Sequence, residues 1–154
     1  LRIRVSERVP VALSLIGSEL RYVDEHGVAF ARLSPAVGNN DLPLVSDASG
    51  EDLKRCVALL RDLSRSDPQI YSRISQVKPV APDGYALFDR ELSATVYAKR
   101  NGLSEKWRAL HAIARAEGFA RASIEYADLR FSERIVIKPR KGPMPDEGAI
   151  HATN

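Results

Sequence analysis

The sequence has few of the residues on which disulfide-bonded and metal-bound proteins depend. A single cysteine, Cys56, among 154 residues excludes an intrachain disulfide and a zinc site built from several cysteines. No apolar run approaches the roughly 20 residues that a membrane-spanning helix needs. The composition, with 44% hydrophobic and 28% charged residues, is that of a folded domain and excludes wholesale disorder.

The motifs of the common enzyme classes are also missing. The sequence contains no G-x-S-x-G, P-loop, G-x-G-x-x-G or H-E-x-x-H pattern. His26 falls in a turn, His111 borders the apolar stripe of a helix, and Cys56 sits among apolar residues as a small buried side chain. No nucleophile, base and orienting group can be combined from these residues, so we expect no catalysis, no cofactor, no metal and no small-molecule substrate.

The excess of positive charge is small. Lys and Arg number 23 and Asp and Glu number 20, so the formal net charge is +3, too low to indicate a nucleic-acid-binding protein. The basic residues alternate with acidic ones, which is typical of a solvated face. A small nucleic-acid-binding domain that uses Arg61, Arg65, Lys99 and Arg100 remains an alternative.

Hydrophobic periodicity predicts an α+β fold, an antiparallel sheet of many short strands with two amphipathic helices packed on it. Residues 34–50 are loop-like. The period of two that indicates strands is found at residues 2–8, 11–16, 20–23, 28–32, 70–80, 85–88, 92–99, 124–131 and 135–137.

Two segments show helical spacing. In the first, Ser49 and Asp52 resemble a capping box, and Asp67-Pro68 is expected to end the helix. In the second, Ser104 can cap a helix whose buried stripe includes Trp107, and Gly118 is expected to end it.

Four short segments occur in a fixed order and carry a resemblance. They are VSERVPVA (residues 5–12), YVDEHGVAF (22–30), LPLV (42–45) before a helix, and YADLRF (126–131) followed by IVIKP (135–139). In this order and spacing the chain resembles the extracytoplasmic part of the bacterial cell-division protein family FtsQ/DivIB. Members of that family show E-R-x-P-x-A, V-D-x-x-G-x-h-F, L-P-x-h and D-L-R-[FY] segments. Residues 46–50 depart from the family, which places a glycine soon after L-P-x-h.

The resemblance implies a single-pass inner-membrane protein at the division septum, with a short cytoplasmic tail, a membrane helix, a POTRA domain and a β domain outside the cytoplasm. This chain would hold the periplasmic β domain, while the membrane helix lies upstream. Residues 1–9 would then be the final strand of a truncated POTRA domain, and residues 10–139 the β domain. Residues 140–154 contain almost no large apolar side chains, so we expect a disordered C-terminal tail.

The resemblance also implies a non-enzymatic divisome scaffold that binds FtsB/FtsL-type division proteins and other divisome components. Ile135–Lys138 form the last predicted strand, and nothing after Pro139 is apolar enough to cover it. A partner could add a strand there. By resemblance, Arg130 would pair with an acidic partner residue and Phe131 would be an apolar anchor. Another periplasmic peptide-binding β module remains an alternative. The predicted partner-binding residues are Arg130, Phe131, Ser132, Glu133, Ile135, Val136 and Ile137.

Overall fold

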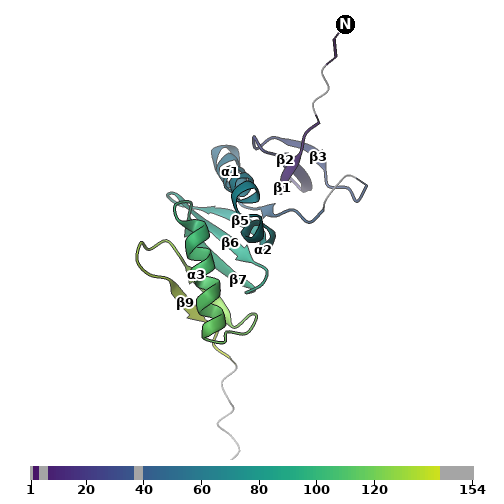
Figure 1. Ribbon diagram of the computed structural model, residues 1–154. Coiled ribbons are helices and arrows are strands. Elements are labelled where there is room, and N and C mark those ends of the chain that lie inside the picture. Colours follow the sequence, from purple (N-terminus) through teal and green to yellow (C-terminus); the bar gives the residue numbers. More distant parts are fainter. Residues whose placement is uncertain (1, 4–6, 37–39, 143–154) are drawn as a thin grey trace, which may run out of the picture.

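The computed structural model describes residues 2–3, 7–36 and 40–142 of the chain. Residues 7–9, before the first strand, and residues 140–142, after the last strand, lie at opposite ends of the molecule (Figure 1). The elements are β1 (Pro10–Ile16), β2 (Glu19–Asp24), β3 (Ala29–Arg32), β4 (Leu44–Val45), α1 (Gly50–Ser66), α2 (Pro68–Arg73), β5 (Ile74–Val80), β6 (Gly84–Asp89), β7 (Ala94–Lys99), α3 (Leu103–Ala116), β8 (Ile124–Asp128) and β9 (Val136–Pro139).

All the strands described form one sheet of nine strands, in the order β3-β2-β1-β4-β5-β6-β7-β8-β9. Neighbours joined by short turns pair antiparallel, as β1 with β2 and β5 with β6. The pairs β1/β4, β4/β5 and β7/β8 are parallel. The predicted α+β class is therefore confirmed, but the expectation of a purely antiparallel sheet was wrong. Parallel neighbours need a long crossover, which α1 with α2 supplies before β5 and α3 supplies before β8.

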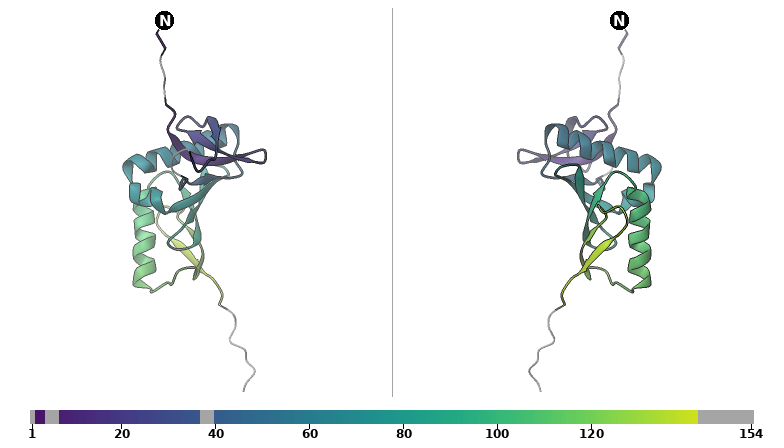
Figure 2. Two further views of the ribbon diagram at one scale, coloured as in Figure 1. Left: turned by 90° about the vertical axis from the view of Figure 1, so that its right-hand side faces the viewer. Right: turned by 90° about the vertical axis from the view of Figure 1, so that its left-hand side faces the viewer.

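The three helices lie on one face of the sheet, and the opposite face carries no helix in the described part of the chain (Figure 2). Helix α1 packs on β1, β4 and β5 through a stripe that includes Leu53, Val57 and Leu60. Trp107 and Leu110 of α3 are fully buried in the same core, as their spacing predicts. One core between helices and sheet thus fixes both edges of the sheet in place.

The register shows which side chains occupy the uncovered face. Gln76, Phe88, Thr95, Tyr126 and Lys138 are successive partners from β5 to β9 and form one row across the sheet. Side chains alternate between faces along each strand, so the flanking residues point into the helix-covered core. The row is half-buried except for Lys138, which is exposed.

The segment after α1 differs from the prediction. A strand was expected from Ile70, but Pro68–Arg73 form helix α2, and β5 begins only at Ile74. Asp67 accepts a hydrogen bond from the Ile70 N–H, and Pro68 occupies the first turn, where a missing N–H has no cost. Asp67 and Pro68 therefore start a helix as well as ending one. The predicted loop at residues 34–50 likewise contains the two-residue strand β4.

The helix ends agree with the sequence only in part. Ser49 is the N-cap of α1, but its side chain makes no capping hydrogen bond, so the predicted capping box is wrong. Helix α3 is preceded by Gly102 in the left-handed conformation, φ 68°, and not by a Ser104 cap. Gly118 ends the helix as predicted: its φ is 68°, and its N–H donates to the Arg115 carbonyl.

Of two core side chains, Cys56 and His111, only Cys56 lies where the sequence predicts. Cys56 is fully buried as expected, and burial raises the pKa of its thiol to about 11, so it stays protonated at neutral pH. His111 was expected at the boundary of the core, but it is buried. Its Nε2 lies 2.6 Å from Oδ2 of Asp89, which is itself fully buried. This hydrogen-bonding partner explains how a histidine can lie so deep.

The ends of the chain leave the domain boundaries as predictions. The described residues Arg2, Ile3 and 7–9 are not in a strand, and residues 1 and 4–6 of the expected POTRA strand lie outside the described residues. Most of the predicted tail, residues 143–154, also lies outside them.

Two of the sequence motifs are joined by an ion pair. Arg8, from the E-R-x-P-x-A segment, donates to Oδ2 of Asp24 at 2.7 Å, and Asp24 belongs to the V-D-x-x-G hairpin. Oδ1 of Asp24 accepts the N–H groups of His26 and Val28 at 3.0 and 2.9 Å. Burial alone would raise the pKa of Asp24, but the two N–H groups and Arg8 outweigh it and lower the pKa below its usual value.

Replacing Asp24 is expected to destabilise the domain in a pH-dependent way. At pH 7 Asp24→Asn should lower the free energy of unfolding by about 2 kcal/mol, because the charge-assisted bonds to Arg8 and the turn are weakened. The lowered pKa means that this contribution is present above the unfolded pKa of about 4 and is lost as the pH falls through the lower, folded value. Urea unfolding at pH 7, 4 and 3 should show the two proteins converging in acid. A gap that stays constant down to pH 3 would contradict this role.

Candidate partner-binding edge

Strand β9 is the last strand of the sheet on the side opposite to β3. It pairs antiparallel with β8 through Val136↔Asp128, Ile137↔Ala127 and Lys138↔Tyr126. No other strand in the described residues pairs with its outer side. The backbone groups of that side are therefore open to a further strand.

The direction of each β9 amide follows from one hydrogen bond. The N–H of Arg140 donates to the Ser123 carbonyl at 2.7 Å, so the backbone groups of Arg140 point toward β8. The backbone N–H and C=O groups of successive residues point to alternate sides of an antiparallel strand. Those of Lys138 and Val136 therefore also point toward β8, whereas the backbone groups of Ile137 and Pro139 point away from it. Proline lacks an N–H, and its position on the outer side leaves the β8–β9 ladder complete. The outward donor of β9 is therefore the N–H of Ile137.

The side chains of β9 divide between the two faces of the sheet. Ile137 of β9 and Ile135, just before the strand, are half-buried and pack against the core on the helix side. Lys138 lies on the uncovered face, where its Nζ is 2.9 Å from Oε1 of Glu125 and above the ring of Tyr126. A strand added to β9 would meet Ile137 on the helix side and Val136 with Lys138 on the uncovered face, and side chains that alternate in this way select partner strands.

The segment after β8 begins with a tightly bound arginine. Arg130 holds both carboxylate oxygens of Asp128, with Nε at 2.9 Å and Nη2 at 2.6 Å, and its backbone N–H also donates to Oδ1. These bonds lower the pKa of Asp128, and the bonds from the Arg130 guanidinium have the largest effect. The guanidinium also lies 5.1 Å from the centre of the Tyr97 ring. Arg130, predicted within a strand, is thus fixed in the turn that follows β8.

The four residues that follow form the exposed bend between β8 and β9. The predicted residues Phe131, Ser132 and Glu133 are exposed, and Phe131 keeps 39% of its surface accessible. The guanidinium of Arg134 lies 4.4 Å from the Phe131 ring centre. With Arg134 they line a shallow surface hollow. The seven predicted residues therefore lie along one segment that runs from the end of β8 through the bend to the first half of β9.

Lys106 belongs to the same region and was not among the predicted residues. Its Nζ donates to the Leu129 carbonyl at 3.0 Å and to the Phe131 carbonyl at 2.6 Å. Lys106 lies in the first turn of α3, and these two bonds hold it against the bend between β8 and β9. Nothing in the sequence marks this lysine, because the contact spans 25 residues and uses backbone oxygens.

The β9 edge also carries cations that lack a carboxylate. Arg134, Arg140 and Lys141 form no ion pair with any carboxylate in the described part of the chain, whereas most of the other basic residues do. They flank β9 at its two ends. The surroundings of the strand therefore favour an acidic partner segment and discourage pairing between two copies of the same edge.

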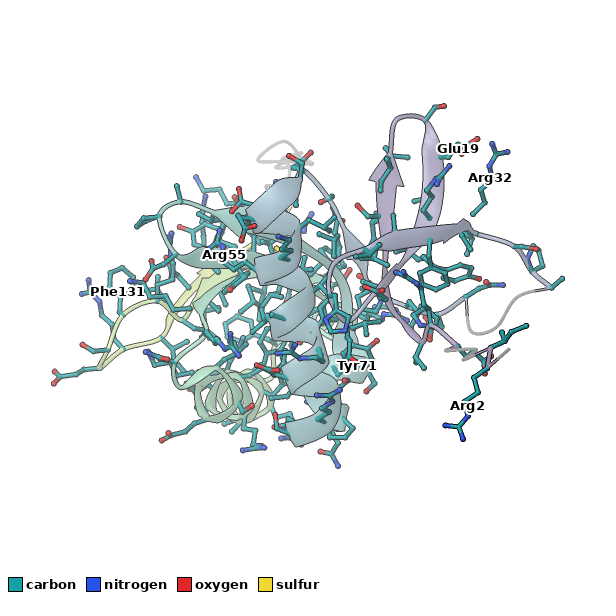
Figure 3. All side chains as sticks on the ribbon, turned by 90° about the horizontal axis from the view of Figure 1, so that it is seen from above. Arg2, Glu19, Arg32, Arg55, Tyr71 and Phe131 are labelled. Carbon is teal, nitrogen blue, oxygen red and sulfur yellow. The ribbon has the colours of Figure 1, made fainter. Side chains whose placement is uncertain are left out.

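The other edge of the sheet is far from this one. Figure 3 shows Glu19 and Arg32 on the opposite side of the molecule from Phe131. Glu19 forms ion pairs with both Arg21 and Arg32, at 3.3 and 2.9 Å. The two edges thus differ: both arginines beside β3 have a carboxylate partner, whereas Arg134, Arg140 and Lys141 beside β9 have none in the described part of the chain.

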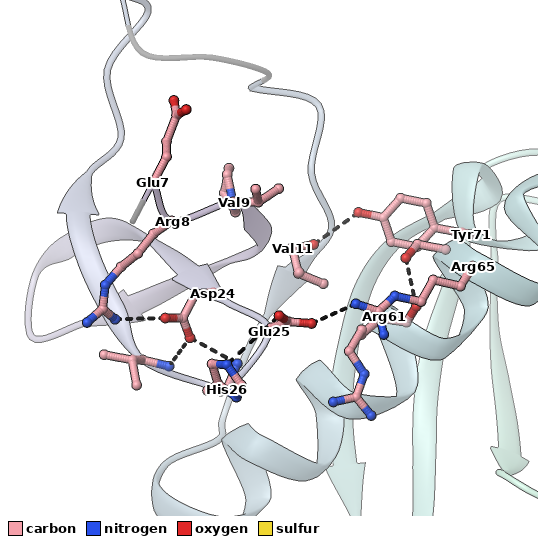
Figure 4. A pocket seen from close by; sticks show the side chains of 13 residues that line it. Glu7, Arg8, Val9, Val11, Asp24, Glu25, His26, Arg61, Arg65 and Tyr71 are labelled. Atoms are coloured by element: carbon pink, nitrogen blue, oxygen red, sulfur yellow. Dashed lines mark hydrogen bonds and ion pairs between the residues drawn. The ribbon is translucent and has the colours of Figure 1, made fainter. Parts of the chain in front are cut away.

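A cavity of about 870 Å³ lies near the start of β1, between the β2–β3 turn and α1 (Figure 4). Two of its carboxylates are already engaged, Asp24 by Arg8 and Glu25 by Arg65 at 2.7 Å. The Tyr71 hydroxyl donates to the Val11 carbonyl across the cavity at 3.0 Å. Four of the charged side chains that line the cavity therefore form two ion pairs with one another.

The residues of the nucleic-acid-binding alternative do not form an unpaired basic surface. Each has an acidic neighbour: Arg61 pairs with Asp62, Arg65 with Glu25, Lys99 with Asp83, and Arg100 with Asp62. Phosphate binding depends on cations that are free to replace counterions, and these four are engaged. The geometry therefore gives this alternative no support.

Within the described ranges, His, Cys, Asp and Glu form no cluster of three or more that could hold a metal ion. Over the same residues, no helix has the length and apolar character needed to span a membrane.

Comparison with known proteins gives one family. The sequence profile of the C-terminal domain of cell division protein FtsQ/DivIB matches residues 14–130. Among solved structures, the chain is similar to the major extracytoplasmic domain of the trans isomer of the bacterial cell division protein DivIB from Geobacillus stearothermophilus. The identity is 17%, the TM-score is 0.48, and the likeness covers 75% of this chain and 99% of that chain. Curated protein sequences gave no match.

The profile match ends at Arg130, so the outer part of the site lies beyond it. The match includes the last three residues of β1 and all the elements from β2 to β8, with the Asp128–Arg130 pair. Phe131 and strand β9 follow the matched range. The position of β9 at the edge is therefore an observation on the structure and does not depend on the match.

Proposed function

From the premise that this chain belongs to the FtsQ/DivIB family of bacterial cell-division proteins, we propose that it is a non-enzymatic scaffold domain that captures other division proteins by strand addition to β9. Family membership supports a role in cell division outside the cytoplasm. The observation that carries the docking mode is the outer side of β9, with its outward N–H at Ile137 and no pairing strand among the described residues.

The bend before β9 supplies the second part of the proposed surface. Phe131 is an exposed aromatic side chain at the end of the free strand, which is the usual place for an apolar anchor. Arg130 uses Nε and Nη2 for Asp128, and its Nη1 is left for a carboxylate of the partner. In this arrangement Asp128 orients Arg130 and does not compete with the partner for the whole guanidinium.

The partners proposed are the extracytoplasmic segments of FtsB- and FtsL-type division proteins. The cations at both ends of β9 support a partner with acidic residues next to its pairing strand. The parent protein is proposed to be anchored in the inner membrane by a helix upstream of Leu1, with residues 1–9 as the end of a POTRA domain. Residues 10–139 would then be the β domain that carries the docking edge.

The direct test is titration calorimetry with the soluble extracytoplasmic segment of the FtsB-type protein from the same organism. Wild-type protein is expected to bind it, and Phe131→Ala should raise Kd by about tenfold or more, because an anchor residue of this kind contributes about 1–2 kcal/mol. Far-UV circular dichroism and thermal unfolding should be unchanged, since Phe131 lies outside the core.

Leu20→Ala is the matched control for this substitution. Leu20 is exposed to a similar degree, 36%, but lies on β2 at the other end of the sheet. Its removal should leave Kd unchanged. Absence of wild-type binding, or equal losses in the two variants, would rule out the β9 edge as the docking site for this partner.

A further inference from the structure

The bend between β8 and β9 is attached to the rest of the domain at few points. Leu129 is buried, and its N–H donates to the Tyr97 carbonyl at 2.7 Å, which fixes the end of β8. Arg130 is fixed by Asp128. Beyond Arg130, the bend has one bond to an element other than its own strands in the described part of the chain, from Lys106 to the Phe131 carbonyl.

The ammonium group of Lys106 bonds to the backbone on both sides of Arg130. It donates to the carbonyl before Arg130 and to the carbonyl after it, at 3.0 and 2.6 Å. Holding both carbonyls fixes the backbone of Arg130 and the direction in which Phe131 leaves the sheet. Bonds from a charged donor are stronger than neutral ones, and an ammonium group can satisfy two acceptors at once.

The lysine itself is held by a rigid element. Its neighbour Trp107 is fully buried, and Leu110 and His111 of the same helix are also in the core. Helix α3 therefore cannot move easily relative to the sheet. Hydrogen bonds from a residue of this helix therefore hold the exposed bend in a fixed position relative to the core.

We propose that Lys106 is a positioning residue for the docking edge: it holds the bend between β8 and β9 in the shape in which Phe131 and the outer side of β9 receive the partner strand. This inference rests on the proposed function of that edge. Without Lys106 the bend samples more conformations, and the partner must order it on binding, which weakens affinity while the folded core is unaffected.

The test compares Lys106→Met with Lys106→Arg. Methionine keeps the aliphatic stem and removes the donors, and arginine keeps a charged donor group that can reach two carbonyls. We expect Lys106→Met to raise Kd for the FtsB-type segment about five- to twentyfold, and Lys106→Arg to recover most of the loss. Lys54→Met, on the exposed side of α1 with Glu51 as its ion-pair partner, is the matched control and should bind like wild type.

Amide hydrogen exchange gives a readout that needs no partner. In Lys106→Met the amides of Leu129 and Val136, which bond to β7 and β8 at the two ends of the bend, should exchange several-fold faster, while those of α3 and of β6 stay protected. If wild-type protein fails to bind the segment, the proposed function is wrong whatever the variant does. If wild type binds and Lys106→Met binds equally well with unchanged exchange in the bend, the proposed function stands and the positioning role is wrong. Loss of protection throughout α3 would also contradict it, by showing a general structural role.

Discussion

Ile137→Pro is expected to weaken capture of a partner strand at β9 by more than about tenfold. The N–H of Ile137 faces outward, so proline removes the donor offered to the partner and leaves the bonds between β8 and β9 in place. Pro139 shows that an outward position of this strand accommodates proline. Titration calorimetry with the FtsB-type segment measures the loss, and thermal unfolding reports on the fold.

Two further variants separate the lost donor from other effects. Ile137→Ala removes the same apolar contacts with the core but keeps the N–H, so the difference in Kd between the alanine and proline variants belongs to the donor. Val136→Pro should instead loosen β9 itself, because the N–H of Val136 faces β8. Equal affinities for the alanine and proline variants of Ile137 would contradict strand addition.

The β9 edge could be predicted from the sequence because local signals were sufficient. A short apolar run, Ile135–Ile137, is followed by a proline and then by a segment with almost no large apolar side chains. The sheet order confirms that β9, which contains Val136 and Ile137 of this run, is an edge strand. The β5–β6 hairpin was equally predictable, since Asp83-Gly84 lies between two alternating segments.

The parallel pairings could not be predicted in the same way. Strand β4 has two residues, Leu44 and Val45, and is a strand only because β1 and β5 lie on either side of it. A segment this short has no periodicity to detect. The same applies to α2, whose six residues follow Asp67-Pro68, a pair that ends one helix and begins another. In both cases the tertiary neighbours decide the local structure.

The roles of single side chains were the least accessible part of the candidate site. Arg130 was expected to pair with a partner, and its nearest carboxylate is Asp128, two residues earlier in its own chain. Lys106 bonds to backbone carbonyls that any sequence would supply. Contacts of this kind depend on how α3 crosses the sheet, which hydrophobic spacing leaves undetermined.

The Arg8–Asp24 pair shows what a sequence motif can mean physically. Two of the segments that carry the resemblance meet in the structure, far from β9, and their shared charges hold a turn. The family resemblance is thus carried partly by residues that stabilise the fold. Motif matching alone cannot distinguish these fold-stabilising residues from the residues of the docking edge. The sheet order distinguishes them, because it places the two groups far apart.

Asp89→Ala is expected to be the most destabilising single substitution considered, with a loss of about 3–4 kcal/mol in the free energy of unfolding. Asp89 is fully buried, its Oδ1 accepts the N–H groups of Glu91 and Leu92 at 2.8 and 2.9 Å, and its Oδ2 meets His111 at 2.6 Å. Alanine would leave two N–H groups and a buried imidazole without an acceptor. The total free energy of unfolding of a protein domain is about 5–15 kcal/mol, so urea unfolding should show a large shift of the midpoint.

The pair also attaches the helix that carries Lys106, so its loss should reach the docking edge. His111 lies on α3, and Asp89 ends β6, so breaking the contact loosens the helix against the sheet. Asp89→Asn keeps an acceptor for the two N–H groups and should lower the free energy of unfolding by about half as much as Asp89→Ala. Asp83→Ala, in the exposed hairpin turn, is the control and should lower it by about 0.5 kcal/mol or less. If Asp89→Ala unfolds at the same urea concentration as Asp83→Ala, the buried pair does not hold α3. If it is destabilised yet binds the partner segment as wild type does where it remains folded, the edge does not depend on the seating of that helix.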